Sequence, residues 1–138
     1  AVIMIHLAKT ASRYFDNAEI IELHHDRKLD APSGTALATA RAMVSAHGKP
    51  FVSPLTGKET LKGTRGGQSD GISIHSIRLP GLVASQEVIF GALGQTLSIR
   101  HDTISRESFM PGVILAIKEV IKRHGLVYGL DVLLNLGD

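Results

Sequence analysis

Hydrophobic positions near the start of the chain change from helical to strand-like spacing. From residue 1 to about residue 15, apolar side chains recur four positions apart, as at Ile3, Leu7 and Ala11. This spacing places them on one face of a helix. Residues 18 to 25 form a mainly apolar run that includes β-branched side chains, which favour an extended backbone. The pattern therefore predicts a helix followed by a strand.

A second helix is predicted by the residues that bound it. Pro32 biases the residue before it away from helical angles, and Ser33 is a typical N-cap. The alanine-rich run that follows predicts a helix to about His47, and Gly48 is a typical C-terminal stop. Residues 48 to 71 are rich in proline and glycine, which predicts a long loop. A loop of this length in a compact domain is usually functional or mobile.

Three strands are predicted after this loop. They cover residues 72–79, 86–92 and 95–103, with Pro80-Gly81 and Leu93-Gly94 at the turns between them. Within the first of these strands the apolar side chains change from one face to the other. The change predicts either a bulge or a sheet that is buried on both sides.

The end of the chain is more apolar than a surface helix requires. Ser105 or Ser108 is predicted to cap a last helix that reaches Gly125, and Pro111 fits its first turn. Apolar side chains occupy much of the predicted surface of this helix. Residues 127–138 are again mainly apolar.

Composition narrows the class of protein. A length of 138 residues favours one domain, and 43% hydrophobic residues favour a globular chain. The net charge is only +2, and no basic tract with interleaved aromatic residues is present, so nucleic acid is not an expected partner. The absence of cysteine excludes disulfides, thiol nucleophiles and zinc sites built on thiolates.

No membrane partner is expected from the sequence. No apolar run approaches the roughly 20 residues that cross a bilayer, and no signal peptide is recognisable, so a cytoplasmic location is the default. The first residues already lie inside a helical pattern with no capping residue before them. We therefore expect this chain to be a fragment of a longer one.

The densest group of reactive side chains lies between the first strand and the second helix. His24 and His25 end the strand, where the backbone turns, so both side chains are able to approach one ligand. Histidine is the side chain best suited to donate a proton near neutral pH. Lys28 follows and adds a positive charge. The alternative is a pair of partly exposed loop histidines beside a solvated lysine.

The start of the second helix adds a predicted anion site. The first N–H groups of a helix have no partner within the helix and attract anions. Gly34 has no side chain to block the backbone, and Ser33 and Thr35 add hydroxyl donors. Together with Lys28 these groups suit one carboxylate or one phosphate. Ser33 has the simpler alternative role of an N-cap, which does not exclude binding.

Other chemistries fit the sequence less well. The residues around Ser33 lack the Gly-x-Ser-x-Gly pattern of hydrolases. Adjacent His24 and His25 do not have the spacing of zinc ligands, so no metal is expected. The glycine-rich run 63–71 matches neither a Walker motif nor a dinucleotide fingerprint and is expected to form a flexible loop or flap. Several other basic residues are expected to be structural or to lie on a sheet surface or interface, namely His75, His101, Arg78, Arg100 and Arg106.

The run from Glu22 to Ala36, Glu-Leu-His-His-Asp-Arg-Lys-Leu-Asp-Ala-Pro-Ser-Gly-Thr-Ala, resembles the signature of the 4-hydroxy-tetrahydrodipicolinate reductase family, also called dihydrodipicolinate reductases. The similarity continues at residues 65–67, 77–83 and 101–106, and so covers nearly the whole chain. Members have an N-terminal dinucleotide-binding domain and a C-terminal α+β domain. The present sequence resembles the second of these, because the Gly-x-Gly-x-x-Gly fingerprint of the first is absent.

The resemblance implies a fold and an activity. Residues 1–106 would form an α+β substrate-binding and tetramerisation domain, a mixed β-sheet flanked by helices. Residues 107–138 would be a helix and tail that return to pack on a dinucleotide-binding domain outside this chain. The implied reaction is the NAD(P)H-dependent reduction of a cyclic dicarboxylate to tetrahydrodipicolinate, in lysine and diaminopimelate biosynthesis. NADPH or NADH would be bound mainly by the other domain, a homotetramer would form through the β-sheet, and this chain alone would be inactive.

The resemblance also implies individual roles. His24 and Lys28 would be the catalytic residues: His24 would be the general acid, and Lys28 would assist by its charge in binding and in stabilising the developing negative charge. Four further residues would hold the substrate carboxylates, namely His25, Ser33, Gly34 and Thr35. A non-catalytic oligomerisation or dicarboxylate-sensing module that retains the anion pocket is the alternative from a different functional class.

Overall fold

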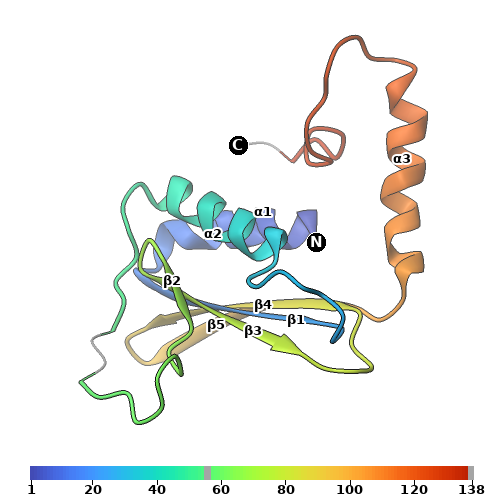
Figure 1. Cartoon of the computed structure of the whole chain (residues 1–138). Coiled ribbons are helices and arrows are strands. Elements are labelled where there is room, and N and C mark those ends of the chain that lie inside the picture. The colour runs from blue at the N-terminus through green and yellow to red at the C-terminus, as the bar shows by residue number, and fades with distance from the viewer. Residues whose placement is uncertain (55–56, 137–138) are drawn as a thin grey trace.

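A mixed five-stranded sheet with two helices on one face forms the body of the molecule (Figure 1). The computed structural model describes residues 1–54 and 57–136. The strand order is β2-β3-β1-β4-β5, in which β1 and β3 are parallel and the other neighbours are antiparallel. The strands are β1 (Asn17–His24), β2 (Gly67–Ser69), β3 (Ile72–Arg78), β4 (Ala84–Ala92) and β5 (Gln95–Thr103). The predicted α+β class with a mixed sheet is confirmed.

The two covering helices begin and end close to where the sequence predicts. Helix α1 (Val2–Ala11) continues into a short 3₁₀ turn, Ser12–Tyr14. Helix α2 (Gly34–His47) is capped by Ser33, whose Oγ accepts a hydrogen bond from the Ala36 N–H at 3.1 Å. Gly48 ends α2 with a φ of 79°, a left-handed conformation that glycine adopts without a steric penalty. Both predicted boundaries of α2 are confirmed.

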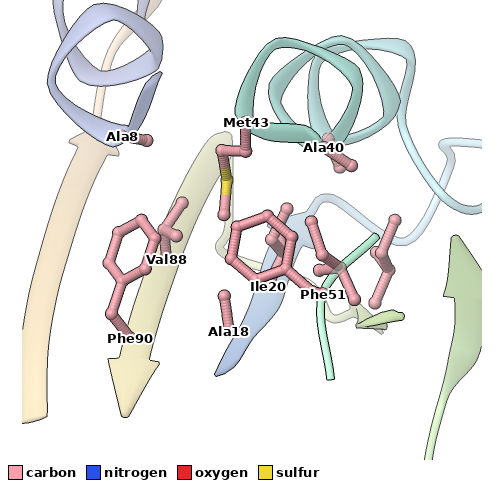
Figure 2. Close-up of a cluster of buried hydrophobic side chains, with 11 residues drawn as sticks. Ala8, Ala18, Ile20, Ala40, Met43, Phe51, Val88 and Phe90 are labelled. Atoms are coloured by element: carbon pink, nitrogen blue, oxygen red, sulfur yellow. The ribbon is translucent and has the colours of Figure 1, made fainter. Parts of the chain in front are cut away.

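The hydrophobic core lies between the sheet and the two helices (Figure 2). Alternate residues of β1 point toward the helices, so that Ile20 is buried beside its β4 partner Val88. Met43 of α2 packs onto the same layer, and Phe90 and Ala8 extend it under α1. The period-two pattern of β1 and the helical pattern of α2 therefore meet in one core.

Around β3 the structure confirms one of the two predicted alternatives, and it differs from the prediction only in the loop before this strand. No bulge is present, because β1 and β3 keep an unbroken register from Glu19–Ser73 to His24–Arg78. Three successive residues of β3, Ile72 to Ile74, are buried, so this end of the strand is covered on both faces. The predicted loop 48–71 also contains the short strand β2, which pairs with β3. Residues 55–56 of that loop lie outside the described part of the chain.

The last helix stands apart from the sheet (Figure 1). Ser105 caps a 3₁₀ turn, Arg106–Phe109, which leads into α3 (Met110–Val120). The prediction that this helix reaches Gly125 is wrong, because i→i+3 hydrogen bonds such as Lys122 N–H to Glu119 C=O tighten its end. No residue of α3 is buried. The tail is irregular through residue 136, and residues 137–138 of the predicted apolar tail lie outside the described range.

Candidate functional site

A cavity of about 560 Å³ opens where β1 ends. The turn after β1, the first turn of α2, the start of α1 and the facing ends of β4 and β5 form its wall. A volume of this size suits a small ring compound. Its hydrogen-bonding and charged wall residues include His24, His25, Lys28, Thr35, His101 and Arg106. Four of the six predicted site residues, His24, His25, Lys28 and Thr35, therefore line one cavity. They come from one continuous stretch of sequence, which runs from the end of β1 to the start of α2.

His24 is held at the wall by a neighbour on its own strand. It lies two residues after Glu22, so both side chains point to the same face of β1. The His24 Nδ1 atom is 2.5 Å from Oε2 of Glu22. An ionised carboxylate only accepts hydrogen bonds, so Nδ1 carries a proton and Nε2 is the nitrogen left to the cavity. The ring of His24 is thus held with Nε2 directed away from Glu22 at the cavity wall.

His25 lies just beyond the strand and reaches the same cavity. Its Nδ1 atom is buried and has no hydrogen-bond partner among the residues that the structure describes. A buried ring nitrogen without a partner is energetically costly. The predicted approach of both histidines to one site is consistent with this geometry.

Lys28 is fixed by the turn that follows β1. The Lys28 N–H donates to the His25 carbonyl oxygen at 3.1 Å, and Nζ lies 2.7 Å from Oδ1 of Asp30. This hydrogen bond holds the pKa of the Asp30 carboxyl below its ordinary value. Lys28 is only about one fifth exposed, whereas Asp30 is mainly exposed. The ammonium group therefore stays near the cavity wall, where a ligand carboxylate would compete with Asp30.

The first turn of α2 presents backbone donors rather than the Ser33 side chain. The Ser33 N–H donates to Oε1 of Glu22 at 3.2 Å, and its Oγ caps the N–H of Ala36. Ser33 is buried and does not line the cavity, whereas Gly34 is exposed and Thr35 lines the wall. A Cβ at Gly34 would meet no atom within 4 Å. The N–H groups of Gly34 and Thr35 belong to the first turn and have no acceptor within the helix.

Glu22 and Arg78 are central to the site, and sequence reasoning assigned neither to it. Glu22 is fully buried, and Arg78 from β3 binds both of its oxygens, at 2.8 Å and 2.9 Å. Burial opposes ionisation of Glu22, but hydrogen bonds from Arg78, Ser76 and His24 outweigh it and hold the pKa of Glu22 below its ordinary value. A signal was present in the sequence, since Glu22 occupies an inward position of the alternating pattern of β1.

The part of the cavity wall formed by β5 and the residues after it carries two more basic residues that we did not predict to belong to the site. Arg106 follows β5 and His101 lies within it, and both line the cavity. Burial lowers the pKa of His101. The expectation that these are only structural, surface or interface residues is therefore incomplete. Their separation of more than 70 residues from His24 along the chain explains why local spacing did not reveal them.

The described residues show neither a metal cluster nor a membrane span. Within residues 1–54 and 57–136, no three histidine, cysteine or acidic side chains are grouped to hold a metal ion. Among the helices of the same part of the chain, none is long and apolar enough to cross a bilayer.

Comparison with known proteins relates the chain to one family. The family model described as "Dihydrodipicolinate reductase, C-terminus" matches residues 1–134. A 4-hydroxy-tetrahydrodipicolinate reductase of Dehalococcoides mccartyi is 61% identical over 136 residues, which is 99% of this chain and 51% of that protein. The reductase of Moorella thermoacetica is 56% identical over 135 residues, 98% of this chain and 50% of its own length. The chain thus spans about half the length of the curated relatives it matches.

A solved structure shows the same fold. The dipicolinate-bound dihydrodipicolinate reductase of Paenisporosarcina sp. TG-14 superposes with a TM-score of 0.86 at 49% sequence identity. The match covers 95% of this chain and 49% of that one. Sequence and structure agree over nearly the whole chain, and the chain therefore belongs to the dihydrodipicolinate reductase family, as its C-terminal domain.

Proposed function

We propose that this chain is the substrate-binding part of a 4-hydroxy-tetrahydrodipicolinate reductase, which acts in lysine and diaminopimelate biosynthesis. The observation that carries the proposal is the single cavity lined by His24, His25, Lys28 and the first turn of α2. The relative that superposes on this chain binds dipicolinate, a cyclic dicarboxylate. A cavity with a cation, backbone donors and two histidines suits a ligand of that kind.

The residues divide into a binding group and a proton donor. Lys28, His25 and the N–H groups of Gly34 and Thr35 hold the substrate carboxylates, with Ser33 shaping the turn that presents them. His24 Nε2 then delivers a proton to the ring as it is reduced. Fixing both carboxylates before the reaction places the ring against His24, which lowers the entropic part of the barrier.

NADPH or NADH, bound mainly by a domain outside this chain, would supply the hydride. The sequence contains no Gly-x-Gly-x-x-Gly turn between a strand and a helix, which a dinucleotide pyrophosphate requires. The residues present therefore fit the substrate and not the cofactor. We accordingly expect the isolated chain to be inactive.

The exposed apolar face of α3 fits one expected partner of the domain. Five apolar side chains of α3 are 45 to 66% exposed, namely Met110, Val113, Ile114, Ile117 and Val120. Exposed apolar patches of this kind mark contacts with other protein surfaces. We assign residues 107–138 to packing on the dinucleotide-binding domain, and we expect the full-length protein to be a cytoplasmic homotetramer.

The proposal is tested in the full-length protein. We expect turnover of 4-hydroxy-tetrahydrodipicolinate with NADPH or NADH, and calorimetric binding of dipicolinate. His24→Gln should lower kcat by about 10²- to 10⁴-fold, the usual contribution of one proton donor, and Lys28→Ala should also lower turnover strongly. His75→Gln, on the other sheet face, is the control and should retain activity. Dipicolinate binding without any turnover in the wild type would favour the sensing module instead.

A further inference from the structure

We propose that Glu22 is a positioning residue whose buried carboxylate fixes two parts of this site. One is the proton donor His24, and the other is the carboxylate cradle, by which we mean the N–H groups of Gly34 and Thr35 in the first turn of α2. The inference rests on the proposed function. Glu22 contacts no ligand itself, because it is fully buried and does not line the cavity. It acts through His24 on one side and through the first turn of α2 on the other.

The two carboxylate oxygens have separate tasks. Oε2 accepts from His24 Nδ1 at 2.5 Å, and Oε1 accepts from the Ser33 N–H at 3.2 Å. Arg78 donates to both, from Nη1 to Oε2 at 2.9 Å and from Nη2 to Oε1 at 2.8 Å. The distance between the histidine and the start of α2 is thus set by the width of a single carboxylate.

The charge of Glu22 decides how His24 is protonated. Because Arg78 is bound to the carboxylate in a fork, the group stays ionised although it is buried. Two oxygens that only accept hydrogen bonds require a proton on His24 Nδ1. Nε2 is then the nitrogen that takes up a second proton and delivers it into the cavity. A histidine without this partner has no such constraint on which nitrogen is protonated.

Glu22→Gln separates this role from simple packing. The amide has the same shape, and its remaining oxygen still satisfies the Ser33 N–H and one nitrogen of Arg78. Its NH₂ group, however, takes the place of Oε2, so it no longer accepts from Arg78 Nη1 and it faces His24 Nδ1 as a donor. The neutral ring must then carry its proton on Nε2, and the doubly protonated ring is disfavoured because two donors would face each other. The carboxylate cradle is kept while proton delivery is lost.

The experiment compares Glu22→Gln with Glu19→Gln in the full-length protein. We expect kcat of Glu22→Gln to fall by at least about 100-fold, while KM changes by less than about threefold. Glu19 lies on the same strand but on the opposite face, bound to Arg65 and His75, so its variant is a matched loss of one charge. Glu19→Gln should keep kcat within about twofold.

A second measurement does not depend on turnover. In ¹⁵N-histidine spectra of the full-length wild type, the neutral His24 ring should carry its proton on Nδ1, and in Glu22→Gln on Nε2. The His24 signal is assigned by its loss in His24→Gln. Should Glu22→Gln fail to fold, the wild-type spectrum still decides the matter. An Nε2-protonated neutral ring in the wild type, or an unchanged kcat in a folded Glu22→Gln, overturns the role of Glu22. A wild type that lacks reductase activity overturns the proposed function, and this role with it.

Discussion

Strand β1 carries two glutamates three residues apart, Glu19 and Glu22, and each is bound by one histidine and one arginine. The odd spacing places them on opposite faces of the sheet. Glu19 binds His75 of β3 at 2.7 Å, and Glu22 binds Arg78 of the same strand. In both pairs the β3 residue lies two positions beyond the direct partner of the glutamate in the β1–β3 register. The same local arrangement is therefore repeated on the two faces.

The Glu19 cluster (Glu19, Arg65 and His75) and the Glu22 cluster (Glu22, Arg78 and His24) differ in burial, and that difference separates their proposed roles. Glu19 is about one third exposed, and its arginine, Arg65, belongs to the loop before β2, so the cluster ties a loop to the sheet. Glu22 has no exposed surface, and its histidine faces the cavity. An ion pair in contact with water contributes about 0–1 kcal/mol. A buried charge that loses its partner costs far more. Burial, rather than residue type, makes the second cluster a candidate for controlling chemistry.

The largest contrast is expected when each cluster loses its arginine. Arg78→Ala leaves the buried Glu22 carboxylate without a counter-charge and should reduce the free energy of unfolding by about 3–5 kcal/mol. Arg65→Ala removes a partly exposed pair and should cost about 0–1 kcal/mol. Urea unfolding of the two variants, followed by circular dichroism, measures the difference. Equal losses of unfolding free energy in the two variants would contradict the proposed difference between the buried and the exposed cluster.

A smaller contrast is expected between two glycines, one near each cluster. Gly66 has a φ of 70°, and a Cβ there would lie 2.5 Å from the carbonyl oxygen of Ile74. Gly66→Ala should therefore destabilise the protein by about 1–3 kcal/mol, because strain and overlap add. Gly34→Ala has open space for its methyl group and should leave stability within about 0.5 kcal/mol.

Dipicolinate binding should be weakened more by Gly34→Ala than by Gly66→Ala, which is the reverse of the order expected for stability. The Gly34 methyl group would cover backbone donors of the α2 turn and weaken dipicolinate binding, which calorimetry on the full-length protein can measure. Gly66→Ala lies on the far face and should bind dipicolinate normally once folded. Normal binding by Gly34→Ala would remove this turn from the proposed carboxylate cradle.

The smallest expected effect is on the free energy of unfolding at acid pH. The hydrogen bonds of both clusters outweigh burial and hold the pKa values of Glu19 and Glu22 below the ordinary value of 4.5. A depressed pKa in the folded state gives stability that is full above the unfolded value and is lost as pH falls through the folded value. Stability should therefore decrease below about pH 4.5. Glu22→Gln should flatten this decrease more than Glu19→Gln, as measured by urea unfolding at a series of pH values.

The sequence specified the local elements because their signals are local. Ser33 and Gly48 mark both ends of α2, since a cap depends only on the adjacent backbone. The strand-end histidines and Lys28 were found because they are consecutive with that helix. The end of α3 was misplaced, because apolar side chains alone do not show where i→i+4 hydrogen bonds give way to i→i+3 ones.

The sequence by itself thus determined most of the elements, the family signature and a cluster of histidines, Lys28 and helix N-terminal groups that we propose as a proton-donor and anion site. Only the tertiary structure decided which side chains act together. Glu22 and Arg78 are 56 positions apart, and the parallel register of β1 and β3 brings them into contact. His101 and Arg106 reach the same cavity through β5. The physical reason is that sheet register and burial are properties of the whole chain, and burial is what gives one of two similar glutamates control over a histidine.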